Sequence, residues 1–158
     1  MNAMRLLLGA CLATAPLSAW AQPSTPPPTE LFLTGLNVSN LDRSIDFYTR
    51  VLGLAEYKRY GDVSGQVQVL LGTPGQAPAR SVLVLVWRKE HNGPYQLGTA
   101  FSRIGVRTPD AQALVGRVKA AGYKVTHEPA RASQTSPVLA FVTDPDGYPV
   151  EVIQEPAP

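Results

Sequence analysis

The chain has 158 residues and a net charge of +2 at neutral pH, and 44% of its residues are hydrophobic. This balance does not predict binding to nucleic acid or to a membrane surface, since both favour a strong basic excess. Cys11 is the only cysteine and lies near the N-terminus. A mature chain that has lost this segment can form neither a disulfide nor a thiolate metal site.

The first 21 residues have the pattern of a secretory signal peptide. A weakly positive start that includes Arg5 precedes an apolar run at 6–17, and Ala19-Trp20-Ala21 is a small-x-small cleavage site. We therefore expect export to the periplasm or the medium, cleavage after Ala21 and no membrane span. Two alternatives stay open: a buried N-terminal helix, and a lipoprotein in which Cys11 carries the lipid.

Residues 22–30 are rich in proline and predict an extended tether, because proline neither continues a helix nor donates to a sheet. Residues 31–156 are predicted to form one domain. Its expected elements, in chain order, are a strand at 31–38, a helix with Asp42 as N-cap that stops at Gly53, and strands at 55–60, 66–71 and 81–88.

The same order of elements then returns about seventy residues later. It predicts a strand at 100–107, a helix at 110–121 that stops at Gly122, and strands at 124–128, 138–142 and 149–154. The fold class is therefore α+β, with two tandem βαβββ modules that form a curved mixed sheet around a concave pocket.

Four stretches of the domain resemble the vicinal oxygen chelate superfamily, which includes glyoxalase I, bleomycin-resistance proteins and extradiol dioxygenases. They are residues 40–48, 51–54, 96–101 and 140–148. The last two, in this order, are more similar to the bacterial glyoxalase I (lactoylglutathione lyase) branch. The resemblance implies the tandem βαβββ fold and a homodimer with pockets at the interface between modules.

The resemblance also implies a divalent metal that is held by one residue on the first and one on the last strand of each half. Those positions are Leu33, Val84, Arg103 and Glu151, of which only Glu151 can ligate a metal. Because a catalytic divalent ion needs about two to four protein ligands, we expect neither a metal nor another cofactor. His127 and His91 do not fall at ligand positions.

The resemblance implies that the lyase branch recognises glutathione through two residues. One is an arginine four residues after the first metal position, and the other is an asparagine four residues after the second. Asn37 and Arg88 stand at these two positions here. Both are polar and remain candidate ligand-binding residues, but the side-chain chemistry differs at each position.

Strand alternation places Arg103, Arg107 and Glu151 on the pocket side of the sheet. We expect an Arg103–Glu151 ion pair in the space of the absent metal, since a guanidinium suits a carboxylate. Three roles stay open. The pair is a structural plug, Arg103 receives an anionic small molecule with Arg88 or Arg107, or Glu151 is a catalytic general base.

The preferred hypothesis is an exported glyoxalase-like protein that binds a small anionic or oxygen-rich molecule, with no nucleic-acid partner. The alternative is an enzyme, either lactoylglutathione lyase-like or another lyase, isomerase or dioxygenase of this superfamily with a divergent or metal-free site. A third hypothesis is an interaction module of the cell envelope that is anchored through Cys11.

Overall fold

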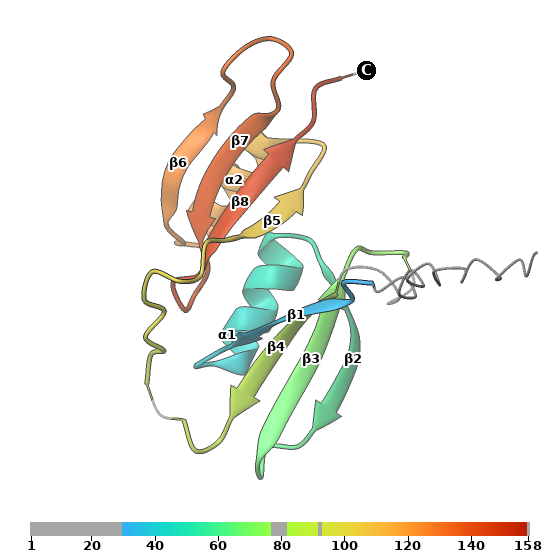
Figure 1. Cartoon of the computed structure of the whole chain (residues 1–158), viewed down its shortest axis with the longest axis vertical. Coiled ribbons are helices and arrows are strands. Elements are labelled where there is room, and N and C mark those ends of the chain that lie inside the picture. The colour runs from blue at the N-terminus through green and yellow to red at the C-terminus, as the bar shows by residue number, and fades with distance from the viewer. Residues whose placement is uncertain (1–29, 77–81, 92, 158) are drawn as a thin grey trace, which may run out of the picture. The chain divides into compact units, whose positions relative to one another are not determined.

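Two βαβββ modules follow one another in the described part of a computed structural model, residues 30–76, 82–91 and 93–157 (Figure 1). The first contains β1 (Leu33–Asn37), α1 (Leu41–Asp46), the π-helical turn η1 (Phe47–Val51), β2 (Ala55–Gly61), β3 (Gln66–Gly72) and β4 (Val82–Arg88). The second contains β5 (Ile104–Arg107), α2 (Ala111–Ala120), β6 (Val125–Ala130), β7 (Val138–Thr143) and β8 (Pro149–Gln154).

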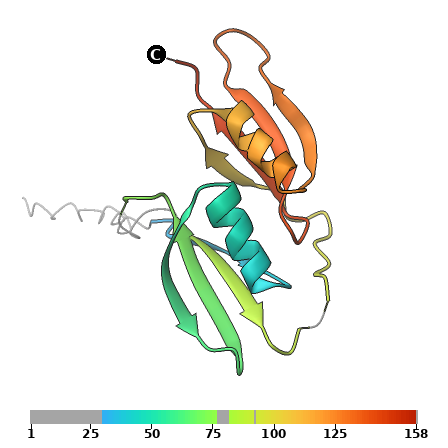
Figure 2. The ribbon, with the colours of Figure 1, turned by 180° about the vertical axis from the view of Figure 1, so that it is seen from behind.

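Each module builds its own four-stranded sheet, with the strand orders β1-β4-β3-β2 and β5-β8-β7-β6. The first strand pairs in parallel with the last, and the other neighbours are antiparallel. The helix α2 lies behind its sheet in Figure 1 and in front of it in Figure 2. The tandem βαβββ prediction is confirmed. The hydrogen-bonded strands form two four-stranded sheets, where one curved sheet was expected.

The N-cap of the first helix is Asn40, two residues before the predicted one at Asp42. Asn40 is extended, with φ −136°, and its side chain accepts a hydrogen bond from the backbone N–H of Arg43 at 3.0 Å. Asp42 therefore lies inside the first turn, where a negative charge suits the helix dipole. Asp110 begins α2 by the same geometry, with Ala113 as the donor at 2.9 Å.

The strand predicted at 100–107 is shorter in the structure and begins only at Ile104. The register pairs Ile104 with Val150, so Arg103 stands opposite Pro149. Proline has no N–H to donate, and the ladder ends there. Arg103 consequently lies immediately before the strand rather than within it.

The end of the first helix contacts both modules. It closes with a π-type hydrogen bond from Leu52 N–H to the Phe47 carbonyl at 2.9 Å. Phe47 and Tyr48 are both fully buried. The Phe47 ring packs edge-on against Tyr123 of the second module, with centroids 4.8 Å apart.

A hydrophobic core packs the helices against the sheets and includes residues of both modules. Burial of each large apolar side chain contributes about 1.5–3 kcal/mol. Fully buried members of this core are Leu36, Val38, Phe47, Tyr48, Val51, Val69, Leu71, Leu85, Val115, Val118, Val142 and Val150.

The turn before β8 joins the modules through the buried carboxylate of Asp144, which is 4% exposed. One of its oxygens accepts the backbone N–H groups of Asp146 at 2.9 Å and Tyr148 at 2.8 Å. The other accepts the Tyr48 hydroxyl of the first module at 2.9 Å. Burial raises the pKa of Asp144, although these hydrogen bonds oppose the shift.

A second carboxylate of the same turn, Asp146, reaches the start of the first helix. Its side chain accepts from the backbone N–H of Ser39 at 3.1 Å and from its hydroxyl, and from the hydroxyl of Ser44 at 3.4 Å. Arg43 adds an ion pair at 3.4 Å. We call the contacts of Asp144 and Asp146 with the first module the carboxylate clamp.

The signal peptide predicted for residues 1–21, the lipidation alternative at Cys11 and most of the predicted tether 22–30 lie outside the described residues. Within the described residues, no helix has the length and apolar character that a membrane crossing requires.

We expect Asp144→Ala to lower the free energy of unfolding by about 2–3 kcal/mol, because two backbone N–H groups and the Tyr48 hydroxyl lose a buried acceptor. Asp144→Asn keeps one acceptor oxygen and should lose less. Urea denaturation at neutral pH measures both, with Asp110→Ala as the matched control that removes only an exposed N-cap, at about 1 kcal/mol. Equal losses in Asp144→Ala and Asp110→Ala would contradict the clamp.

The raised pKa of Asp144 sets the sign of its pH dependence. Its titration adds stability below the unfolded pKa of about 3.9, and this stability is lost as pH rises through the folded value. The advantage of the wild type over Asp144→Asn should therefore be larger at acid than at neutral pH.

Candidate functional site

The predicted ion pair between Arg103 and Glu151 is present in the second module. Arg103 Nε donates to Glu151 Oε2 at 2.7 Å. The Glu151 side chain is 14% exposed and that of Arg103 is 49% exposed. The Glu151 side chain is thus largely covered, while about half of the Arg103 side chain stays in contact with solvent.

Further contacts orient the guanidinium of Arg103. Its Nη1 donates to the hydroxyl of Ser102 at 3.3 Å, and its central carbon lies 6.0 Å from the centroid of the Phe141 ring. Among the described residues, Nη2 donates to no acceptor. Glu151 and Phe141 therefore hold the group while its outer edge remains open to a ligand, and a planar edge with two N–H donors suits a carboxylate.

Two other predicted site residues meet in the first module. Arg88 at the end of β4 donates from Nη1 to the side-chain oxygen of Asn37 at the end of β1. The backbone carbonyl of Asn37 also accepts a hydrogen bond from the hydroxyl of Tyr148, at 3.0 Å. Tyr148 belongs to the second module and follows Asp146 of the carboxylate clamp by two residues. The Asn37–Arg88 pair is therefore held from both modules, but it belongs to a different sheet from Arg103 and Glu151.

The strand registers of the two modules show which residues correspond. In the first, Gly35 of β1 pairs with Val84 of β4. In the second, Gly105 of β5 pairs with Glu151 of β8. Leu33 and Arg103 each precede their glycine by two residues and take the same place in the two modules.

The four positions implied as metal ligands thus offer a single carboxylate, and that carboxylate is paired with a cation. Leu33 is 47% exposed and Val84 is 3% exposed, and neither has a donor atom. Within the described ranges, no group of three or more histidine, cysteine, aspartate or glutamate side chains could hold an ion. This donor set does not fit a catalytic divalent metal, which needs about two to four protein ligands.

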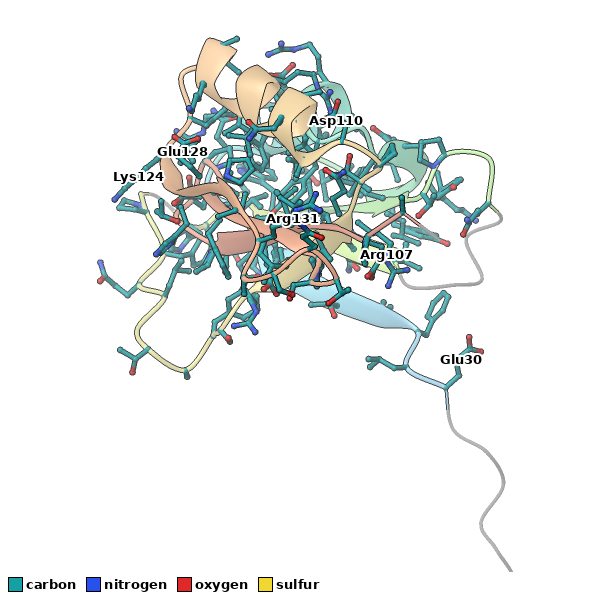
Figure 3. All side chains as sticks on the ribbon, turned by 90° about the horizontal axis from the view of Figure 1, so that it is seen from above. Glu30, Arg107, Asp110, Lys124, Glu128 and Arg131 are labelled. Carbon is teal, nitrogen blue, oxygen red and sulfur yellow. The ribbon has the colours of Figure 1, made fainter. Side chains whose placement is uncertain are left out.

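Arg107, also named as a candidate, points to solvent at the end of β5. It pairs with Glu155 at 3.3 Å, and its side chain is 76% exposed (Figure 3). His91 stacks on Tyr95 with centroids 3.6 Å apart, whereas His127 lies on β6 with its ring 5.4 Å from that of Phe141. The structure does not bring Arg107 or His91 to the Arg103–Glu151 pair.

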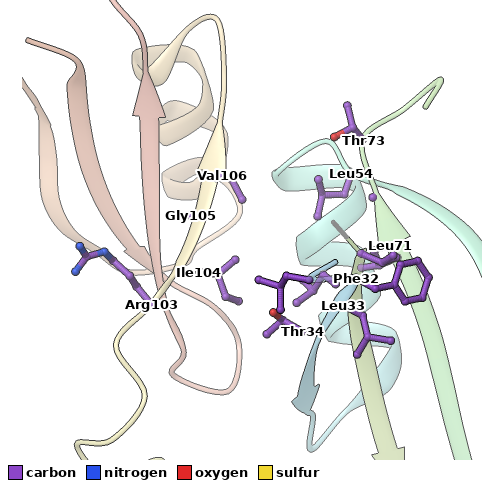
Figure 4. A pocket seen from close by; sticks show the side chains of 14 residues that line it. Phe32, Leu33, Thr34, Leu54, Leu71, Thr73, Arg103, Ile104, Gly105 and Val106 are labelled. Carbon is purple, nitrogen blue, oxygen red and sulfur yellow. The ribbon is translucent and has the colours of Figure 1, made fainter. Parts of the chain in front are cut away.

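A cavity of about 350 Å³ lies between the first strands of the two modules. Its lining is mostly apolar, with Leu54, Leu71, Ile104 and Val106 among the residues, and Arg103 also contributes to it. In Figure 4, Ile104 and Val106 point toward the first module, whereas Arg103 points the other way, toward the remaining strands of its own sheet. The open edge of the guanidinium is therefore on a different face from this cavity.

Sequence analysis did not identify Phe141 as part of the site. The available signal was the alternation along 138–142, which puts Phe141 on the same side as Glu151 in the neighbouring strand. The burial of Asp144 and Asp146 was also missed, because a DPDG sequence is typical of an exposed turn.

The fold is that of an α+β protein built from two tandem βαβββ modules. The sequence profile of the glyoxalase/bleomycin resistance protein/dioxygenase superfamily matches residues 31–152. The chain belongs to this superfamily, and the predicted resemblance is confirmed.

Several relatives carry the name lactoylglutathione lyase. That of Neisseria meningitidis serogroup A is 37% identical over 127 residues, which cover 79% of this chain and 90% of the relative. The Escherichia coli O157:H7 protein is 33% identical over 125 residues, or 79% and 92% of the two chains.

Solved structures of glyoxalase I are also similar to this protein. The trypanothione-dependent Leishmania major enzyme has a TM-score of 0.70 and 28% identity, over 81% of this chain and 88% of that one. Glyoxalase I from Zea mays has a TM-score of 0.71 and 28% identity over 80% of this chain, which spans only 44% of the maize chain.

We expect the double variant Arg103→Met/Glu151→Leu to unfold within about 1 kcal/mol of the wild type, because apolar residues often replace an ion pair without loss. Arg103→Met alone should be less stable than the double variant, since it leaves the largely covered carboxylate unpaired. Urea denaturation compares them with Arg107→Met/Glu155→Leu, the exposed pair of the same module. A loss above about 2 kcal/mol in the first double variant alone would show that the pair is a structural plug.

Proposed function

We propose that this protein binds a small anionic, oxygen-rich molecule at Arg103 without the help of a divalent metal. The observation that carries the proposal is the 2.7 Å contact between Arg103 Nε and Glu151. The Arg103 side chain stays half exposed, at a position where the superfamily resemblance implies a metal ligand.

Glu151 supports this role by holding the cation rather than by doing chemistry. Its Oε2 accepts from Nε, so the guanidinium plane is fixed before a ligand arrives and less side-chain freedom is lost on binding. The carboxylate of a ligand then takes the edge that points away from Glu151, in a two-pronged hydrogen bond. Oε1 of Glu151 is left to accept a hydroxyl group of the ligand.

The Asn37–Arg88 pair supplies a second polar group but does not favour glutathione. The lyase branch is implied to have arginine at position 37 and asparagine at position 88, and this chain has the two residue types exchanged. The exchanged side chains still contact each other. Arg88 therefore sits on a different strand from the implied arginine, and a ligand shaped for the usual arrangement meets its donors in the wrong places.

We further propose that two copies associate and that the chain is exported. Three consecutive apolar residues are exposed at the start of the domain: Leu31 (85%), Phe32 (44%) and Leu33 (47%). Exposure of such a patch to water is unfavourable, so burial in an interface with a second copy is favoured. Export rests on the signal-peptide pattern that ends at Ala21.

The second candidate function is that of a lactoylglutathione lyase-like enzyme, and the identity of 37% to a relative of that name favours it. In that case Glu151 would act as the general base. The salt bridge to Arg103 weighs against this role, because the Oε2 lone pair is already engaged by a cation.

Anion binding predicts that pyruvate, D-lactate, succinate or phosphate raises the melting temperature at constant ionic strength. The rise should disappear in Arg103→Gln, which loses the cation, and persist in Arg107→Gln, the matched control at the other end of β5. Differential scanning calorimetry makes the comparison. A wild type that responds to none of these anions, or equal responses of the two variants, would contradict the proposal.

The same purified protein can be used to test the lyase-like alternative against the binding proposal. After treatment with a chelator, the protein is supplied with Ni²⁺ or Zn²⁺ and the adduct of glutathione and methylglyoxal. We expect no metal-dependent turnover. Stoichiometric metal binding with turnover would establish the lyase-like alternative instead.

Native mass spectrometry of the protein recovered after expression of the full chain should show two copies, each beginning at Gln22. Cys11→Ser should leave this mass unchanged, because Cys11 is removed with the signal peptide. A lipid-sized mass increase that the Cys11→Ser variant lacks would instead support the envelope-anchored alternative. A monomer at micromolar concentration would contradict the dimer.

A further inference from the structure

A row of paired residues crosses one face of the second sheet beside the proposed anion site. Gly105 on β5 pairs with Glu151 on β8, Glu151 with Phe141 on β7, and Phe141 with His127 on β6. Directly paired residues share a face of a sheet. The side chains of Glu151, Phe141 and His127 are therefore presented together, with Arg103 next to them.

Phe141 lies between two groups that favour aromatic contact. The guanidinium carbon of Arg103 is 6.0 Å from its ring centroid. The His127 ring is 5.4 Å away at an interplanar angle of 71°, an edge-on contact. Phe141 is partly buried and His127 is exposed. An aromatic strip thus runs from the cation to the outer strand of the sheet.

Gly105 leaves room at the β5 end of this row. Its backbone does not adopt a positive φ, so conformation does not demand glycine there. A Cβ built at this position would meet only the Ile153 methyl, at an ordinary contact distance of 3.7 Å. The glycine keeps the surface beside Glu151 free of a side chain.

The first module shows that the fold itself does not require this chemistry. By its registers, the corresponding row is Gly35, Val84, Leu70 and Lys58. It has the same glycine but neither a carboxylate nor an aromatic ring. The aromatic and charged residues of the second row are therefore additions to a shared backbone plan, which points to recognition rather than to folding.

We propose that this row binds an aromatic carboxylate, with its carboxylate on the open edge of Arg103 and its ring against Phe141 and His127. The inference rests on the proposed function, since Arg103 is the anion receptor in both. Paired aromatic rings add about 0.5–1.5 kcal/mol beyond the area they bury. The row should therefore discriminate an aromatic acid from a saturated acid of the same size and charge.

The test uses benzoate and cyclohexanecarboxylate as probes of the purified protein in NMR titrations of its backbone amides. We expect benzoate to bind about five-fold more tightly, with the largest shifts in β6 and β7. Phe141→Leu should remove the preference for benzoate over cyclohexanecarboxylate, because it removes the ring beside Arg103. Leu70→Val, at the corresponding position of the first module, should keep it.

His127→Gln provides a second variant if Phe141→Leu does not fold, and it should also reduce the preference for benzoate. Equal binding of the two acids by the wild type, abolished for both by Arg103→Gln, would overturn the aromatic inference and leave the anion site standing. Failure of both acids to bind in an Arg103-dependent way would overturn the inference and count against the proposed function as well.

Discussion

The carboxylate of Asp144 connects the two modules and determines where the site residues can stand. It closes its own turn through the N–H groups of Asp146 and Tyr148, and it receives the hydroxyl of Tyr48 from the first helix. With Tyr148 fixed, its hydroxyl reaches the carbonyl of Asn37. The turn also feeds directly into β8, which carries Glu151. One buried group thus sets the position of a residue in each candidate pair, and burial of its charge is the energetic cost, as its raised pKa shows.

A comparison of the two modules distinguishes the residues that the fold requires from those that are free to serve recognition. Both copies use a parallel pair of first and last strands, and both place a glycine of the first strand beside the same position of the last. The helix-facing sides of the sheets are apolar in both and form the core. On the other side the copies differ, with Val84 and Leu70 in one and Glu151 and Phe141 in the other. Because Val84 and Leu70 are not part of the main cluster that packs the helices against the sheets, the chemistry at these positions can change while the fold is retained.

Arginine in a position that the superfamily resemblance assigns to a metal ligand changes what the site can recognise. A metal ion draws several ligand atoms around one point, whereas a guanidinium presents a planar edge with directed donors. In the proposed function, Glu151 neutralises part of that charge and fixes its plane, and an aromatic neighbour adds a flat surface. Such a site would select a ligand by its shape and charge, and it would lack a metal ion to activate the ligand as an electrophile. This is consistent with binding rather than catalysis.

Periodicity and stop signals in the sequence determined the repeated βαβββ order, the helix ends at Gly53 and Gly122, and the common side of Arg103 and Glu151. These features depend on local backbone geometry, which near neighbours in the chain encode. Only the tertiary structure decided that the strands form two sheets, that β5 begins at Ile104 opposite Val150, and that the side chains of Asp144 and Asp146 are buried against the first helix. It also decided that Phe141 and His127 adjoin the ion pair. Each of these depends on which distant segments meet, and single-sequence patterns carry no information about that pairing.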